Sequence, residues 1–411
     1  MPMNMMTRFS LYGFLKNLDF SQPFLILFYL SLGLSFLQIG ILVSFLNICV
    51  NIMEIPSGAI ADIYGRKSSM LVSLSSYIIA FTVFAFSHDY WPLFIAAFFY
   101  AVGDAFRTGT HKAMIFDWLR TNNRLEEKTK VYGFTRSWSK YGSALSVVIS
   151  AAIVIVSSDY RWIFLCSIIP YVLGIWNMSR YPSYLNSRVG DTISITRIVS
   201  HTFGSVGTAF RNSSIRKLII QSMGFEGVFE VTKDYLQPIL KAQALALMVF
   251  IALPERESTA IVVGTVYFVL YIISASASRR AHLFAKQFRS EDTAIIVMIF
   301  SGALLALLSS AGFHFKVFIL AIAAYIANNV IQNFWRPILV AQYDDHAQSH
   351  QQATILSIES QTKTIGITII APVAGYLADN FGIQASLLLL SIIMLALGLF
   401  SLNGSKKQVS G

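Results

Sequence analysis

The sequence predicts an all-α integral membrane protein with twelve transmembrane helices. Of its 411 residues, 55% are hydrophobic and only 13% are charged, whereas a soluble domain carries about 25% charged residues. Long apolar runs recur along the chain with the length of about 20 residues that a helix needs to cross a bilayer. The runs lack the alternation of about ten residues that marks a membrane β-barrel. These observations exclude a water-soluble enzyme.

The predicted spans follow one another with short connections. The first apolar stretch, about 9–61, yields two spans only if it divides between Gly33 and Ser35, which places Lys16 and Asp19 inside the first helix. The other spans are expected at about 68–88, 91–119, 130–156, 160–180, 214–238, 258–278, 292–311, 315–342, 352–378 and 384–403.

Basic residues collect in alternate connections between these spans, and cytoplasmic loops are the ones that accumulate Lys and Arg. This asymmetry predicts that both termini lie inside, in an inner (cytoplasmic) or plasma membrane, and it accounts for the net charge of +10 without a nucleic-acid partner. The apolar segment 242–253 is too short to cross, so we expect a re-entrant or interfacial piece on the outer side.

The longest polar connection divides the chain into two halves. We expect a first six-helix bundle over 1–180, a cytoplasmic linker with an amphipathic segment over 181–213, and a second six-helix bundle with a short tail over 214–411. Two matched halves with a substrate site near the midplane are a common transporter plan. The sequence therefore predicts a central polar cavity.

A motif lies between spans two and three, where residues 58–67 read G-x-x-x-D-x-x-G-R-K. Gly58 and Gly65 allow helices to approach closely and the chain to turn tightly. Asp62 and Arg66 are four residues apart on a helix and can form an ion pair. The motif is specific because it combines a fixed spacing, particular residue types and a defined position between two spans.

This loop resembles the signature loop of the major facilitator superfamily, and the preceding Glu54-Ile55-Pro56-Ser57 resembles its bacterial drug-efflux-like (tetracycline-transporter-like) branch. The resemblance implies that Asp62 docks near Gln351 to Thr354 in the outward-facing state, and that Asp117 is the partner of Arg66. A plain structural ion-pair cluster is the alternative. The gating set implied by the resemblance comprises Glu54, Gly58, Asp62, Gly65, Arg66, Lys67 and Asp117.

The chain also departs from the family pattern. A second octad, Gly375 to Gly382, repeats Gly-x-x-Ala-Asp-x-x-Gly, but it falls between spans eleven and twelve on the outer side and lacks the basic pair. Tyr141-Gly142-Ser143-Ala144 stands where the antiporter signature of span five is expected, and Tyr100 stands where span four has an arginine. These departures weaken the expectation of proton–drug antiport.

Charged residues recur inside the spans, where a single charge costs at least about 2.5 kcal/mol at the bilayer centre. Helical spacing places them on stripes, which we expect to converge on one water-filled cavity. The expected cavity residues are Lys16, Asp104, Arg107, His111, Lys112, Arg136, Trp138, Lys140 and Lys363, and the candidate proton-coupling carboxylates are Asp19, Glu226, Glu230 and Glu359.

The basic bias of the first half and the acidic bias of the second predict a small charged solute, such as an organic anion, a zwitterion or a chelator. Internal pairing, such as Asp104 with Arg107 or Glu359 with Lys363, is the alternative, and it would fit a multidrug/proton antiporter. A desolvated carboxylate can couple transport to protons. His111 could also titrate, or it could serve only as a hydrogen-bonding partner.

We therefore expect a secondary transporter that works by alternating access as a monomer, with a small-molecule substrate, protons and the lipid bilayer as its partners. No H-E-x-x-H or nucleotide-binding loop occurs, so an intramembrane enzyme, a metal site, a cofactor and direct ATP use are not expected. A non-transporting receptor with a transporter fold remains the other class.

Overall fold

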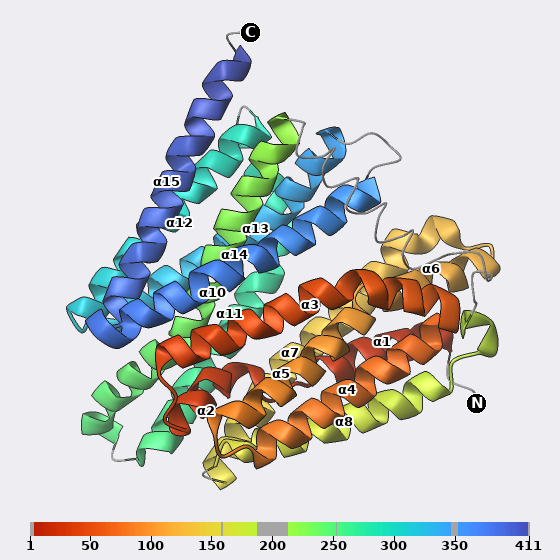
Figure 1. The fold of residues 1–411 in the computed structure, drawn as a ribbon, viewed down its shortest axis with the longest axis horizontal. Coiled ribbons are helices and arrows are strands. Elements are labelled where there is room, and N and C mark those ends of the chain that lie inside the picture. Colours follow the sequence, from red (N-terminus) through yellow and green to blue (C-terminus); the bar gives the residue numbers. More distant parts are fainter. Residues whose placement is uncertain are drawn as a thin grey trace. The chain divides into compact units, whose positions relative to one another are not determined.

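The computed structural model describes residues 4–157, 159–186, 213–251, 253–288, 290–346 and 352–409, and the regular elements within these ranges are helices (Figure 1). The first part holds α1 (Met5–Lys16), η1 (Gln22–Phe24), α2 (Leu25–Ser31), α3 (Phe36–Tyr64), α4 (Arg66–Phe86), α5 (Tyr90–Arg107), α6 (Thr110–Thr121), η2 (Leu125–Glu127), α7 (Lys128–Ser157), α8 (Arg161–Ser179) and η3 (Ser183–Asn186). The second part holds α10 (Ser213–Ile251), α11 (Glu255–Ala285), α12 (Glu291–His314), α13 (Phe318–His346), α14 (Gln352–Phe381) and α15 (Ile383–Val409). The amphipathic segment of the predicted linker lies outside the described residues.

Nine of the described helices are long and apolar enough to cross a membrane, namely α3, α4, α7, α8, α11, α12, α13, α14 and α15. The three remaining predicted spans correspond to α1 with α2, to α5 with α6, and to α10. Each of these three has a break in its helix or a cluster of charged side chains. The predicted class, an all-helical integral membrane protein, is confirmed.

The first span is broken. Gly33, with a φ of +79°, ends it where the sequence predicted. However, α1 already stops at Lys16 and η1 begins at Gln22, so Asp19 lies in the break and its predicted position inside a helix is wrong. Pro23, at the start of η1, favours a new helix start because its missing N–H leaves no helical donor unpaired there.

Serine side chains satisfy the backbone of this break. Ser146 and Ser150 of α7 donate to the carbonyls of Asp19 and Phe20, at 2.7 and 2.5 Å, and the N–H of Phe20 donates to Ser167 Oγ of α8 at 3.0 Å. Unpaired backbone groups are costly inside a membrane and are tolerated only where protein partners replace water. The three serines therefore allow an irregular first span.

The fourth span is broken as well. The expected continuous helix over 91–119 is wrong, because α5 ends at Arg107 and α6 begins at Thr110, after Gly109 with a φ of +77°. Glycine adopts a positive φ without a steric penalty. As a consequence, His111 lies on a different helix from Asp104.

The seventh span is longer than predicted. Residues 242–251 continue α10, whose 39 residues reach about 58 Å at 1.5 Å per residue. The hydrocarbon core is only about 30 Å thick. The expected separate re-entrant or interfacial piece is therefore wrong, because these residues continue a helix that is longer than the hydrocarbon core is thick.

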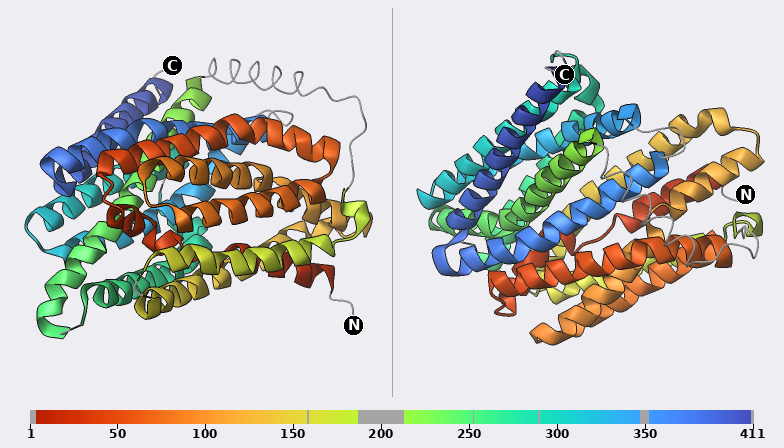
Figure 2. Two further views of the ribbon diagram at one scale, coloured as in Figure 1. Left: turned by 60° about the horizontal axis from the view of Figure 1, so that its bottom comes forward. Right: turned by 45° about the horizontal axis from the view of Figure 1, so that its top comes forward.

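The chain forms two compact units: unit 1 holds Met1–Phe28 and Ile48–His201, and unit 2 holds Tyr29–Asn47 and Thr202–Gly411. In unit 1, α4 packs against α5 and α8, and α1 packs against α7 and α8 (Figure 1). In unit 2, α12 packs against α13 and α15, and α10 packs against α13 and α14 (Figure 2). The helix α3 contributes residues to both units.

Candidate functional site

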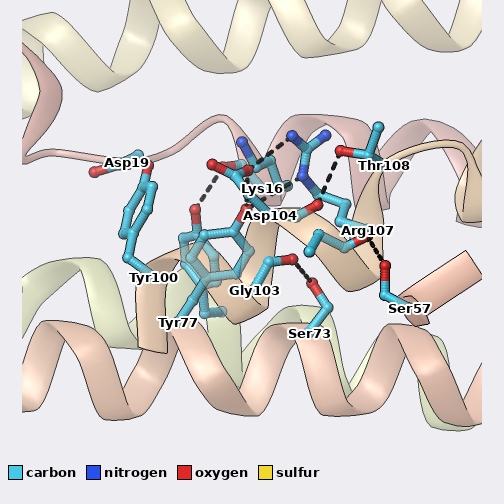
Figure 3. A network of polar contacts seen from close by, with 12 residues as sticks. Lys16, Asp19, Ser57, Ser73, Tyr77, Tyr100, Gly103, Asp104, Arg107 and Thr108 are labelled. Atoms are coloured by element: carbon cyan, nitrogen blue, oxygen red, sulfur yellow. Dashed lines mark hydrogen bonds and ion pairs between the residues drawn. The ribbon is translucent and has the colours of Figure 1, made fainter. Parts of the chain in front are cut away.

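A network of charged and aromatic side chains lies inside unit 1 (Figure 3). The Arg107 guanidinium pairs with Asp104 Oδ1 at 2.9 Å, and the Tyr77 hydroxyl donates to the same oxygen while it accepts from Arg107 Nε at 3.2 Å. Lys16 Nζ lies 5.7 Å from the centre of the Tyr77 ring and interacts electrostatically with Asp104. The pairing of Asp104 with Arg107, which the sequence left as the alternative to a solute-facing role, is present, and Lys16 is the second base beside the same acid.

Asp19 lies at the other end of this network and is 6% exposed. Its Oδ1 accepts hydrogen bonds from the N–H and the hydroxyl of Ser21, at 3.0 and 2.5 Å, and its Oδ2 accepts one from the Tyr100 hydroxyl at 3.3 Å. Tyr100 also packs edge-on against Tyr77, with ring centres 5.0 Å apart. Tyr100, at the position where the resemblance implies an arginine, is thus a neutral donor to the buried carboxylate.

His111 faces Tyr12 of α1, and their ring centres are 4.0 Å apart. The Tyr12 hydroxyl and His111 Nε2 are both buried, and neither has a hydrogen-bond partner in the part of the chain that the structure describes. Both groups interact electrostatically with Arg107. The structure therefore places His111 next to the network through Tyr12, without a direct bond to Asp104.

Two bases of α7 stand apart from the acids. Arg136 and Lys140 lie one helical turn apart, and neither forms an ion pair within the described ranges. Trp138, between them in sequence, is 38% exposed and packs edge-on against Phe14 at 6.0 Å between ring centres. This face of α7 carries a positive charge of two that no described carboxylate neutralises.

Lys112 lies elsewhere. Its ammonium is 5.6 and 5.5 Å from the ring centres of Phe116 and Tyr132, a distance at which cation–π attraction acts. The predicted cavity residue Lys112 is therefore not joined to the Asp104 network by any described contact.

Unit 2 contains a separate cluster on α10 and α14. Lys363 Nζ lies 3.0 Å from Glu230 Oε1 and 3.2 Å from Glu226 Oε2, and Lys233 Nζ lies 2.6 Å from Glu230 Oε2. Glu226 is fully buried, and its contact with Lys363 lacks hydrogen-bond alignment. One lysine is thus shared by two carboxylates. Glu359, the expected partner of Lys363, has its side chain outside the described residues.

Three buried polar side chains of α13 also lie in unit 2, and sequence reasoning missed two of them. Trp335 stacks on Phe225 of α10 with ring centres 4.0 Å apart. Trp335 Nε1, Asn328 Oδ1 and Gln332 Oε1 are buried without hydrogen-bond partners among the described residues. Their spacing of four and three residues places them on one helical face, which was the available sequence signal.

The motif between α3 and α4 forms an ion-pair group in unit 1. Arg66 pairs with Asp117, as the resemblance implied, and Arg66 Nη2 lies 3.4 Å from Asp62 Oδ1. Lys67 Nζ donates to the carbonyls of Ser179 and Tyr181 at 2.7 Å each, at the end of α8. The loop between α3 and α4 therefore binds both α6 and the end of α8. The expected docking of Asp62 near Gln351 to Thr354 lies outside what the structure describes.

The remaining parts of the motif are its two glycines and the four residues before it, Glu54–Ser57, which we call the entry sequence. Gly65 has a φ of +101°, which favours glycine, whereas Gly58 has open space around the position of a Cβ. Ser57, next to Pro56 in the entry sequence that begins with Glu54, donates to the carbonyl of Ala105 at 2.9 Å. The entry sequence thus joins α3 to α5.

Comparisons with known proteins agree with this architecture. The chain is 23% identical over 394 residues to the uncharacterized MFS-type transporter YxaM of Bacillus subtilis (strain 168), which covers 91% of this chain and 89% of the relative. Among solved structures it is similar in fold to the nucleoside transporter NupG, with a TM-score of 0.79, 13% identity and coverage of 98% of this chain and 100% of that one.

Two further structures share the fold. A POT family transporter in complex with 5-aminolevulinic acid has a TM-score of 0.76, with 15% identity and coverage of 98% and 96% of the two chains. A D-xylose-proton symporter has a TM-score of 0.70, with 14% identity and coverage of 97% and 96%. Residues 4–360 match the family described as the Major Facilitator Superfamily. This chain is therefore a membrane transporter of the Major Facilitator Superfamily.

Proposed function

We propose that this chain is a proton-coupled secondary transporter, working by alternating access, of a small solute that carries a negative group. The observation that carries this proposal is the pair Arg136 and Lys140, two bases one turn apart on α7 without a described counter-charge. Two adjacent uncompensated bases inside a span are expensive. A carboxylate or phosphate on the solute would relieve their repulsion.

Three other bases inside the spans have partners within the chain. Arg107 is paired with Asp104, Lys363 is paired with Glu230, and Lys112 lies over two aromatic rings. Lys16 shares Asp104 with Arg107. The charge argument therefore rests first on the two bases of α7. It supports an organic anion, a chelator, or a zwitterion whose positive end meets an acidic group.

The cluster of unit 2 supports proton coupling. Glu230 pairs with both Lys233 and Lys363, whereas Glu226 contacts only Lys363 among the described bases and has no aligned hydrogen bond. Protonation of Glu226 removes the charge that competes for Lys363 and leaves the lysine to Glu230. Asp19 is the second candidate, although its carboxylate already accepts three hydrogen bonds.

The experiment is thermal stabilisation of the purified protein by di- and tricarboxylates, amino acids, chelators and lipophilic cations. A ligand at 100 times its Kd stabilises the folded state by about 2.7 kcal/mol. We expect a melting shift with anionic solutes that disappears in Arg136→Gln and Lys140→Gln. Lys112→Gln is the matched control, because it removes a base that lies over aromatic rings, and it should keep the shift.

Either of two outcomes would contradict the proposal. An anion-dependent shift that survives the double substitution at Arg136 and Lys140 removes the role of α7. A shift with lipophilic cations alone indicates a multidrug exporter of the efflux-like branch, as the entry sequence at Glu54 suggests. Flux into proteoliposomes that does not depend on a pH gradient would refute the proton coupling.

A further inference from the structure

The N-terminus of α3 is completed by a residue of α14. Asp379 accepts the backbone N–H of Phe36 on Oδ1 at 2.7 Å and that of Leu37 on Oδ2 at 2.8 Å. The N–H of Gln38 donates to Ser35 Oγ at 3.3 Å, and the N–H of Ser35 donates to Gln38 Oε1 at 2.9 Å. A helix leaves its first N–H groups without internal partners. The capping box of α3 satisfies one of them, and Asp379 satisfies two.

The backbones of the two helices also touch. A Cβ at Gly40 would collide with the backbone of α14, and a Cβ at Gly375 would collide with the carbonyl of Phe36. One turn along α3, Ser44 Oγ donates to the carbonyl of Thr368 at 2.8 Å. The contact is therefore built from a glycine on each helix, a hydrogen bond and a cap.

We call this contact the α3–α14 seam, formed by Phe36–Ser44 and Thr368–Asp379. It lies within unit 2, whereas α3 from Ile48 onward belongs to unit 1. The start of α3 is therefore counted with unit 2 and the rest of the helix with unit 1. The positive-inside rule places the seam at the outer end of α3.

The octad that contains Asp379 has the same pattern as the motif loop between α3 and α4. Residues 58–65 and 375–382 share Gly-x-x-Ala-Asp-x-x-Gly, and each octad ends a helix at a glycine with a positive φ, +101° and +84°. In the first octad, Asp62 is 41% exposed and lies 3.4 Å from Arg66. In the second octad, Asp379 has no basic neighbour in the motif, which leaves its carboxylate for the helix cap.

We propose that Asp379 is an outer latch, which holds the start of α3 against α14 and must release it when the transporter opens to the outside. A negative charge at a helix N-terminus is favoured by the helix dipole, and hydrogen bonds to a carboxylate are stronger than neutral ones. Release costs little free energy because Asp379 is exposed. Water can then donate to its carboxylate in place of the N–H groups of Phe36 and Leu37. This inference does not depend on the identity of the solute.

The test measures access to the seam from outside. Ser44→Cys, in a protein with Cys49 and Cys166 changed to Ser, places a thiol at a position that is 7% exposed. We expect a membrane-impermeant thiol reagent to label it about five- to tenfold faster in Asp379→Ala, because a coupling of that size is usual between conformational states. Asp379→Asn, which keeps one acceptor and loses the charge, should fall between.

Gly375→Val tests the seam independently of charge. Its side chain would push against the carbonyl of Phe36, so it should speed labelling in the same direction. Asp89→Asn is the matched control, since Asp89 starts α5 at the same expected side without a side-chain capping bond, and it should leave the rate unchanged.

A second reporter separates release of the latch from general loosening. Ser391→Cys lies in α15, where the serine is 7% exposed and bonds to the carbonyl of Ala303. Faster labelling at both Ser44→Cys and Ser391→Cys would mean that Asp379→Ala merely destabilises unit 2. Two other outcomes would overturn the latch. One is an unchanged labelling rate at Ser44→Cys in a folded Asp379→Ala protein. The other is a labelling rate in Asp89→Asn that rises as much as in Asp379→Ala.

Discussion

At the scale of single residues, the charges inside the spans differ in what compensates them. Asp104 and Arg107 neutralise each other, and Asp19 is held by three hydrogen-bond donations. Lys363 serves two carboxylates, one of them fully buried. The two partners differ, because Glu230 also bonds Lys233 whereas Glu226 has no aligned hydrogen bond, so loss of the charge on Glu226 would leave Lys363 to Glu230.

Removal of Lys363 should therefore destabilise the protein more than removal of one of its partners. Breaking a buried pair from one side costs about 3 kcal/mol or more, since an uncompensated charge is left behind. We expect Lys363→Gln to melt well below the parent, and Lys363→Gln with Glu226→Gln to recover much of the loss. The measurement is a melting curve in detergent for both single variants and the double variant.

The matched control is Lys233→Gln, whose side chain is 43% exposed and contacts only Glu230 among these acids. It should cost less than Lys363→Gln. If the double variant melts no higher than Lys363→Gln alone, then the repulsion assigned to Glu226 does not exist.

At the scale of elements, the two spans whose helix is broken both carry a charged side chain at or next to the break. The break between α1 and η1 contains Asp19, and the break between α5 and α6 follows Arg107 directly. A helix that stops inside a membrane frees backbone groups that need partners. In the first span these partners are the hydroxyls of Ser146, Ser150 and Ser167.

Loss of these hydroxyls should weaken the first span. Each buried carbonyl left without a donor costs about 1–3 kcal/mol, so Ser146→Ala with Ser150→Ala should lower the melting temperature clearly. Ser137→Ala is the control on the same helix, because Ser137 bonds the carbonyl of Phe134 within its own helix. If the control and the double variant had the same melting temperature, Ser146 and Ser150 would not stabilise the break in the first span.

At the scale of the whole molecule, the orientation in the membrane is a prediction that rests on the distribution of charge along the sequence. Basic residues fill alternate connections of the sequence, and this is the pattern of cytoplasmic loops. The structure supplies exposed positions for a test, with Asp89 in the connection before α5 and Asn122 in the connection after α6.

A cysteine at Asp89 should react with an impermeant maleimide in intact cells, whereas a cysteine at Asn122 should react only after permeabilisation. Both variants need Cys49 and Cys166 changed to Ser, since the native thiols are partly exposed. Labelling of Asn122→Cys in intact cells would reverse the predicted orientation and would also place the α3–α14 seam on the inner side.

Some of the candidate site was readable from the sequence. The spacing offered the pair Asp104 and Arg107 as the alternative to a cavity role, because residues three apart on a helix are neighbours. The pair Arg66 and Asp117 was implied by resemblance alone. Tyr77 and Trp335 were missed, since a single aromatic residue in an apolar run gives no local signal of a polar partner.

The sequence by itself determined the all-helical membrane class, the division of the first stretch at Gly33 and the motif loop, because each depends on residues close together in the chain. Only the tertiary structure decided which acids share Lys363, where the first and fourth spans break, and what caps α3. These depend on residues far apart in sequence: Asp379 and Phe36 are separated by 343 positions. A local pattern can show that a helix start needs an acceptor, but the packing of distant helices decides which side chain provides it.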